Sequence, residues 1–211
     1  MSHFPIQRNV VFAVYGTNPV RKRYRNRHII HVFGALYCGS DLCYELTKGG
    51  FFLILTGLYN KETTEQLTDE LLSEDENKYH AFLILDVDCF KQINDIYGHA
   101  VGDIVLQKFG KLLKGTFREG DILGRIGGDE FGVIMKNIQT KDIAMKKAEE
   151  LLAKTQAYKI DELKGNNISI SIGISTAPQD GDCYMDLYKR ADQALYQAKR
   201  SGKARVCNYF S

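Results

Sequence analysis

The sequence predicts an α/β domain in which helices flank a central sheet that is mixed or mostly antiparallel. Residues 81–85 form a continuous apolar run, as in a strand buried on both faces. Isoleucines alternate with small residues over 168–174, as in a half-buried strand. Apolar residues recur at helical spacing over 101–117. Strands and helices therefore interleave along the chain, which is typical of a layered α/β domain.

The other elements of the domain are expected in a regular order. They are, in chain order, helix 63–73, strands 121–126 and 131–136, helix 141–157, helix 187–198 and strand 205–209. The sequence Gly-Gly-Asp-Glu between the two central strands is a hairpin signal, so these strands should pair with each other.

The chain divides into two segments of different charge. Residues 1–50 carry seven basic and two acidic side chains, a net +5, whereas the remainder carries a net −3. We therefore expect a basic segment over 1–52, which is a linker or a remnant of an upstream regulatory region, and one domain over 53–211. The basic run Arg21–His28 could bind an anionic membrane or nucleic acid. The linker interpretation is favoured, and no nucleic-acid partner is expected.

Cysteine usage and hydropathy favour a cytoplasmic protein. The five cysteines are odd in number and include no C-x-x-C pair, which is not the pattern of a disulfide framework. Cys38 and Cys43 have no second Cys/His pair at zinc-finger spacing. The start of the chain has no secretion-signal pattern. Apolar runs 29–38 and 51–58 are shorter than the ~20 residues of a membrane span, so no transmembrane segment is expected.

Acidic side chains gather where two of the expected strands end. Asp86 and Asp88 close the buried strand, and Asp129 and Glu130 lie at the tip of the hairpin. If these strands pair, the carboxylates converge and repel one another, which a hard divalent cation relieves. Mg²⁺ prefers oxygen ligands and is usually held by carboxylates together with substrate phosphates.

Glycines and cations complete the pattern. Gly127 and Gly128 allow a bulky ligand to approach the backbone. Lys91 lies within reach of a phosphate near Asp86, and basic residues gather at 199–205, after the last helix. Carboxylates that hold metal beside cations that hold phosphate indicate nucleotide phosphoryl transfer.

At these residues the chain resembles the GGDEF family, the diguanylate cyclases. The stretch Arg125–Phe131 (RIGGDEF) is similar to the family signature. Four further stretches resemble family motifs in the right order and spacing over about 53–209. They are LTGLYN at 55–60, DVDCFKQINDIYGH at 86–99 followed by Gly102-Asp103, SISIG at 169–173, and RAD with ALY and AK at 190–199.

The resemblance implies a palm-like nucleotidyl cyclase fold and condensation of two GTP into cyclic di-GMP with release of two pyrophosphates. It implies two Mg²⁺ (or Mn²⁺) per active site, held by Asp86, the Val87 carbonyl, Asp129 and Glu130. The implied catalytic residues are Asp129 as the base, Glu130 and Lys91. The implied substrate-binding residues are Phe90, Lys91, Asn94, His99, Asp103, Gly127, Gly128, Lys199 and Lys203.

Two further expectations concern regulation and assembly. Arg118 and Asp121 form an R-x-x-D at the spacing of the family's inhibitory site for cyclic di-GMP, which implies product inhibition. Each domain holds one GTP, and each 3′-hydroxyl must attack the other nucleotide, so a head-to-tail homodimer is expected to be the active species.

Departures from the family pattern and alternatives also follow from the sequence. Leu53 replaces an Asp that is common at the domain start, Lys203 replaces a more usual Arg, and Cys89 stands where aromatic residues or His are common. The main alternative function is a catalytically silent GGDEF domain that senses cyclic di-GMP or GTP. A membrane or nucleic-acid adaptor driven by Arg21–Arg27 is the weaker alternative.

Overall fold

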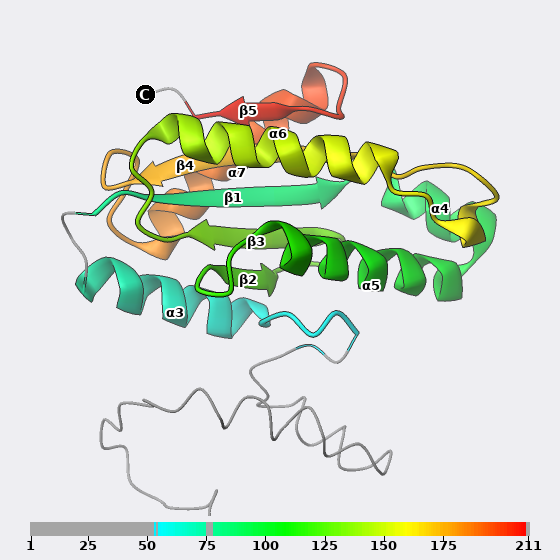
Figure 1. The fold of residues 1–211 in the computed structure, drawn as a ribbon, viewed down its shortest axis with the longest axis horizontal. Helices are drawn as coiled ribbons and strands as arrows, with labels where there is room; N and C mark the ends of the chain where they lie inside the picture. The colour runs from blue at the N-terminus through cyan, green and yellow to red at the C-terminus, as the bar shows by residue number, and fades with distance from the viewer. Residues whose placement is uncertain (1–52, 54, 75–77, 210–211) are drawn as a thin grey trace, which may run out of the picture. The chain divides into compact units, whose positions relative to one another are not determined.

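The computed structural model describes residues 53, 55–74 and 78–209. Among these residues, a sheet of five strands lies between two layers of helices (Figure 1). In chain order the elements are α3 (Lys61–Glu74), β1 (His80–Val87), α4 (Phe90–Tyr97), α5 (His99–Thr116), β2 (Ile122–Arg125), β3 (Glu130–Met135), α6 (Lys141–Ala157), the 3₁₀ helix η2 (Asp161–Leu163), β4 (Ile170–Ala177), α7 (Tyr184–Arg200) and β5 (Val206–Asn208). The expectations for residues 1–52 lie outside the described residues.

The strand order is β2-β3-β1-β4-β5. β1 pairs antiparallel with both β3 and β4, β2 pairs antiparallel with β3, and β5 joins β4 in parallel. This mixed, mostly antiparallel sheet between helical layers confirms the fold class that the sequence predicts. β1 is central, which explains why its apolar run is continuous rather than alternating.

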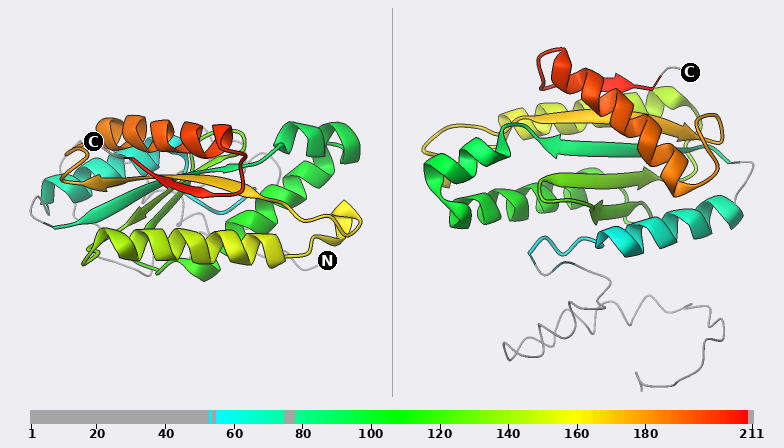
Figure 2. Two further views of the ribbon diagram at one scale, coloured as in Figure 1. Left: turned by 90° about the horizontal axis from the view of Figure 1, so that it is seen from above. Right: turned by 180° about the vertical axis from the view of Figure 1, so that it is seen from behind.

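Each face of the sheet is covered by a pair of helices, as the view from above shows (Figure 2). α5 and α6 cover one face, where Phe109 of α5 meets Phe131 of β3 edge-to-face at 4.8 Å between ring centroids. α3 and α7 cover the other face, where Phe82 of β1 meets Tyr184 of α7 at 5.4 Å. Both cores are almost completely removed from water, so burial of apolar surface is their main stabilising term.

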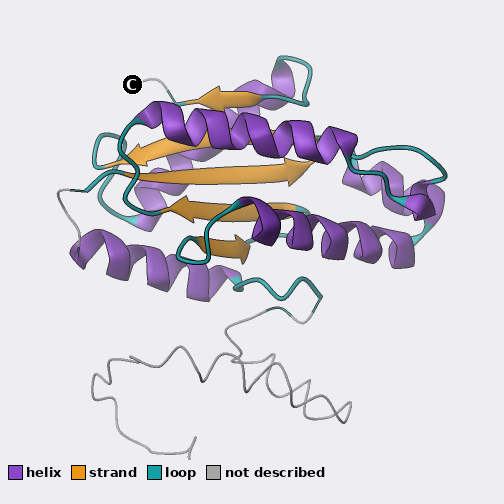
Figure 3. Cartoon of the chain, in the orientation of Figure 1, coloured by secondary structure: helices purple, strands orange, loops and turns teal. Residues whose placement is uncertain are grey.

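Two short elements, α4 and η2, were not expected from the sequence (Figure 3). α4 follows β1 directly and packs its partly buried Phe90, Ile93 and Tyr97 against the core. Its N-cap, Cys89, adopts a left-handed conformation with φ of 58°, and Gly98 ends it with φ of 87°. A helix of only 8 residues without a Ser, Thr, Asp or Asn cap carries little of the usual start signal.

Gly173 fixes how closely α7 approaches the sheet. A Cβ added to Gly173 would lie 2.1 Å from the Ala191 carbonyl oxygen and 2.3 Å from the Leu195 backbone nitrogen. Both contacts are to backbone, so they cannot be relieved by rotating a side chain. The glycine of the SISIG stretch is therefore required by helix–sheet packing.

We predict that Gly173→Ala lowers the free energy of unfolding by about 3 kcal/mol or more, because overpacking must move α7 from the sheet. Gly115→Ala in α5 is the matched control, since nothing lies within 4 Å of a Cβ there. Alanine at this helical position should stabilise by ~0.5–1 kcal/mol. Chemical denaturation measures both, and a Gly173→Ala protein as stable as the wild type would contradict this packing.

Candidate active site

Three carboxylates meet where β1 runs alongside the hairpin. Asp86 lies at the end of β1, as the sequence predicted, and its partner across the β1–β3 ladder is Glu130. The Val87 N–H donates to the Asp129 carbonyl oxygen at 3.2 Å, so the hairpin tip lies against the same part of β1. The pairing that the sequence predicted therefore brings Asp86, Asp129 and Glu130 together.

The negative charge of the buried Asp86 is only partly compensated. Its residue is 7% exposed, and removal from water raises the pKa of its carboxyl group. An ion pair of 2.7 Å with Lys199 of α7 opposes that rise, whereas the nearby charges of Asp129 and Glu130 add to it. Among the described residues, Lys199 is the only cation that forms an ion pair with one of these three acids, although Arg125 interacts with Asp129 and Lys203 with Asp86 at longer range. The oxygen donors of the three acids fit a hard divalent cation.

The turn between β2 and β3 is shaped by glycine and held by Arg125. A Cβ on Gly127 would lie 2.8 Å from a Glu130 carboxylate oxygen, so this position has no room for a side chain unless Glu130 moves. The Arg125 guanidinium donates two hydrogen bonds to the Gly128 carbonyl, at 2.6 and 3.0 Å. Sequence reasoning quoted Arg125 within the RIGGDEF stretch but assigned it no role.

The residues that are expected to bind the guanine base lie on α4 and at the start of α5. Asn94 packs so closely against Gly102 that a Cβ there would lie 1.9 Å from the Asn94 side-chain oxygen and 3.2 Å from Phe90. The charge of Asp103 acts on Arg125, where it opposes the lowering of the Arg125 pKa by burial. The base-binding candidates and the hairpin therefore border the same region.

Lys91 and His99 are exposed on α4 and at the start of α5. Both belong to the elements that carry Asn94 and Asp103. Neither side chain forms a hydrogen bond or an ion pair within the described part of the chain, so their assigned roles stay predictions.

Asp88, the second acid of the D-x-D pair, was expected to join the acidic cluster, but the structure gives it other partners. The Asp88 carboxylate accepts hydrogen bonds from the hydroxyls of Ser169 and Ser171 at 2.8 and 2.7 Å. It also accepts from the Ala204 N–H at 3.1 Å. Because β1 ends at Val87 and the chain turns at Cys89, Asp88 is directed to β4 and to the segment after α7.

Comparisons with known proteins agree with this geometry. The sequence model of the family described as "Diguanylate cyclase, GGDEF domain" matches residues 54–205. The chain belongs to the GGDEF family.

Individual relatives and solved structures show how similar the chain is to known proteins and how much of each protein the similarity covers. Diguanylate cyclase A of Treponema denticola is 36% identical over 157 residues, which are 74% of this chain and 40% of that protein. The chain thus spans well under half the length of this curated relative. The GGDEF domain of TpbB from Pseudomonas aeruginosa matches with a TM-score of 0.71 at 32% identity, over 75% of this chain and 94% of that one.

A third neighbour is the GGDEF domain of DgcB from Caulobacter crescentus, solved in complex with c-di-GMP. It matches with a TM-score of 0.70 at 25% identity, over 77% of this chain and 97% of that one. These likenesses confirm the expected palm-like fold of the GGDEF domain.

The R-x-x-D pair of this GGDEF domain lies in the loop between α5 and β2. The two Asp121 carboxylate oxygens accept hydrogen bonds from the backbone N–H groups of Arg118 and Lys136, each at 3.1 Å. The Arg118 side chain is 62% exposed and its Nε lies 4.0 Å from Asp121, whose side chain is 3% exposed. Asp121 therefore shapes the loop, while Arg118 presents its guanidinium to solvent.

The two departures at the ends of the domain, Leu53 and Lys203, both make defined local contacts. Leu53 closes the opening turn through its backbone: its N–H donates to Leu58 at 2.8 Å, and its carbonyl accepts from Gly57 at 2.7 Å. Lys203 extends to Cys89, with 3.1 Å between Nζ and Sγ. Arg205 donates to the Lys203 carbonyl at 3.1 Å.

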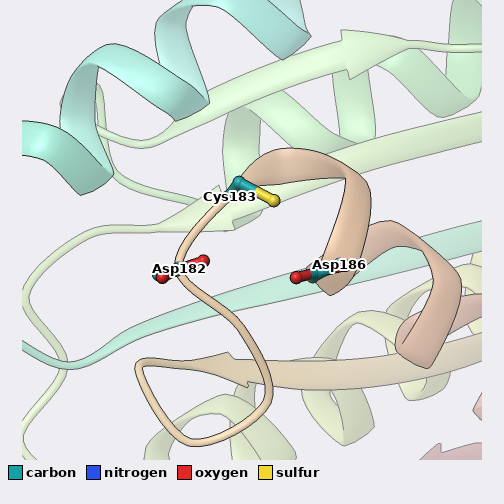
Figure 4. Close-up of side chains that lie close together, drawn as sticks. All are labelled: Asp182, Cys183 and Asp186. Atoms are coloured by element: carbon teal, nitrogen blue, oxygen red, sulfur yellow. The ribbon is translucent and has the colours of Figure 1, made fainter.

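A separate group of possible metal ligands lies at the start of α7. Figure 4 shows Asp182, Cys183 and Asp186 there, with their ligand atoms within 4.8 Å of one another. Asp186 belongs to the first turn of α7, where a negative charge stabilises the helix dipole, so this group has a structural explanation. Among the described residues, no helix combines the length and apolar character needed to cross a bilayer.

We predict that Lys199→Met makes the stability of the metal-free protein more sensitive to pH. Because the Asp86 pKa is raised above its ordinary value of 3.8, the folded state keeps a proton that the unfolded state loses, and stability falls as pH rises above that value. Without Lys199 the pKa rises further. The loss of stability should be small near pH 4 and reach about 1–2 kcal/mol near pH 7.

Denaturation in EDTA over this pH range measures the effect. Lys189→Met, an exposed lysine of the same helix, is the control and should show no such trend. A Lys199→Met deficit that is the same at every pH would contradict the assigned ion pair.

Proposed function

We propose that this chain is a diguanylate cyclase, which condenses two GTP molecules into cyclic di-GMP and releases two pyrophosphates. The observation that carries the proposal is the buried Asp86, which lies opposite Glu130 across the β1–β3 ladder and beside Asp129 at the glycine turn, with Lys199 paired to it. Membership of the GGDEF family and the c-di-GMP-bound relative support the same reaction.

The chemistry required is a nucleotidyl transfer carried out twice. In each transfer a 3′-hydroxyl oxygen forms a bond to the α-phosphorus of the other GTP, and the bond from that phosphorus to the β-phosphate bridging oxygen breaks. We assign Asp129 as the base that accepts the hydroxyl proton. Lys91, Lys199 and Lys203 would offset negative charge on the triphosphate and on the leaving pyrophosphate.

We assign two divalent cations, Mg²⁺ or Mn²⁺, to Asp86, the Val87 carbonyl, Asp129 and Glu130. When bound, these ions would neutralise phosphate charge and favour the attacking hydroxyl in its deprotonated form. The fit rests on the oxygen donors gathered there and on the only partial compensation of the Asp86 charge by Lys199.

Base selection is assigned to Asn94 and Asp103, with Phe90 and His99 beside them. A carboxylate accepts hydrogen bonds from the N1–H and the exocyclic amine of guanine, a pair of donors that adenine lacks in this arrangement. The close contact of Asn94 with Gly102 holds its amide in a restricted position.

The active species is proposed to be a head-to-tail homodimer. One domain binds one GTP, and the two transfers need each 3′-hydroxyl near the α-phosphate held by the partner. Facing domains hold the reacting groups close together, and in well-oriented reactions such proximity removes a large part of the activation free energy.

We predict that Asp129→Ala lowers cyclic di-GMP production from GTP by at least about 100-fold, because the proton acceptor and a metal ligand are lost together. Binding of GTP should survive in part, since the base and phosphate contacts remain. Chromatography of the products measures the rate, with Glu149→Gln on the exposed face of α6 as the control. Near-normal turnover by Asp129→Ala would refute the assigned role.

We also propose that cyclic di-GMP inhibits the enzyme through Arg118. Arginine can bond phosphate or the guanine edge with two parallel hydrogen bonds. Because both Asp121 carboxylate oxygens accept hydrogen bonds from backbone N–H groups, Asp121 is assigned mainly to fixing the loop that presents Arg118.

We predict that Arg118→Ala raises the cyclic di-GMP concentration needed for half-inhibition by at least about tenfold, the loss expected for a hydrogen bond to a charged group. The uninhibited rate should be retained. Glu119→Gln, at the adjacent exposed residue, is the control. Inhibition curves that coincide for wild type and Arg118→Ala would remove this role.

A further inference from the structure

Asp88 joins three parts of the chain that are distant in sequence. Its residue is 6% exposed and its carboxylate accepts from Ser169 and Ser171 on the β4 side and from the Ala204 N–H after α7. The Asp88 N–H also donates to the Ser169 carbonyl at 2.9 Å. These hydrogen bonds satisfy the buried carboxylate and no ion pair is needed, although the charge of Lys203 acts on it at longer range, so its place in the fold is different from that of Asp86.

The backbone around this carboxylate adopts an unusual conformation. Cys89, Lys203 and Ala204 have φ of 58°, 61° and 49°. Left-handed backbone is unfavourable for residues with a Cβ and persists where surrounding contacts hold it. The hydrogen bond from the Ala204 N–H to Asp88 is such a contact, and the Lys203 N–H donates to the Ala198 carbonyl at 3.0 Å.

This conformation determines where Lys203 lies. Its ammonium group contacts Cys89, the residue directly after Asp88. The chain then enters β5, where the Ile172 N–H donates to the Arg205 carbonyl at 2.9 Å and Val206 pairs with Ile172. The exposed lysine thus lies between β5 and the end of β1, close enough to Asp86 and Asp88 for their charges to raise its pKa after the larger effect of Cys89.

We propose that Asp88 is a positioning residue: by accepting the Ala204 N–H, it holds residues 203–204 in the left-handed conformation that places Lys203 for the triphosphate. The metal ligand Asp86 and the positioning residue Asp88 thereby have separate tasks within one D-x-D. The triphosphate as ligand rests on the proposed function, whereas the support of residues 203–204 by Asp88 does not.

The test is Asp88→Asn in the full chain, because asparagine keeps the shape but loses the negative charge and one of the two oxygens that accept from Ser169, Ser171 and Ala204. Hydrogen exchange should accelerate at the amides of 203–208. Affinity for a GTP analogue with a methylene group between the α- and β-phosphates, measured with Mg²⁺ by calorimetry, should fall at least about tenfold. Affinity for Mn²⁺ without nucleotide should stay within about threefold of wild type.

A rescue separates positioning from general stability. Ala204→Gly in the Asp88→Asn background should recover at least about threefold of the lost analogue affinity, because glycine adopts the left-handed conformation without a Cβ penalty. Should Asp88→Asn not fold, Ser169→Ala removes one donor from Asp88 and should give the same exchange pattern with a smaller loss of affinity. Turnover should show a raised KM for GTP with a smaller change in kcat.

Three results would overturn the proposal. One is an unchanged exchange rate at 203–208 in Asp88→Asn, and another is lower thermal stability with unchanged analogue affinity. The third is loss of Mn²⁺ binding, which would make Asp88 a metal ligand. If the wild-type chain binds no analogue, the proposed function fails, and the exchange experiment still decides whether Asp88 supports residues 203–204.

Discussion

A carboxylate that is buried in the central strand of a sheet needs a nearby positive charge. At Asp86, α7 provides that charge only in part. Lys199 lies 2.7 Å away, but Asp129 and Glu130 bring further negative charge to the same place. The result is a site built of oxygen donors with a deficit of positive charge. Such a site favours a divalent cation and the phosphates that accompany it.

The remaining architecture serves to keep these groups in register. Gly173 lets α7 lie close enough to the sheet for Lys199 to reach β1. Arg125 ties the glycine turn to its own strand, so the hairpin tip keeps its shape beside Val87. The GGDEF signature therefore has a structural role beside its proposed chemical one: its glycine makes room for the Glu130 side chain, and Arg125 holds the turn.

Much of this was accessible from the sequence because it depends on short-range patterns. The apolar run over 81–85 and the hairpin signal at Gly-Gly-Asp-Glu predicted strands that the structure pairs, and the pairing of β1 with β3 places Asp86 opposite Glu130. Long-range hydrogen bonds leave no such pattern. The partners of Asp88 lie 81 to 116 residues away, so its separation from the acidic cluster could not be predicted. The roles of individual site residues stay predictions.

The central claim is that the site around Asp86 makes cyclic di-GMP in a dimer, and product formation at varied protein concentration tests it most directly. The full chain would be incubated with GTP and Mg²⁺, with ATP and EDTA as separate controls, and the nucleotides separated by chromatography. The account predicts cyclic di-GMP from GTP with Mg²⁺ but not with ATP or in EDTA. The rate per protein molecule should rise with protein concentration as dimers form. Bound GTP that yields no cyclic di-GMP at any protein concentration would contradict it.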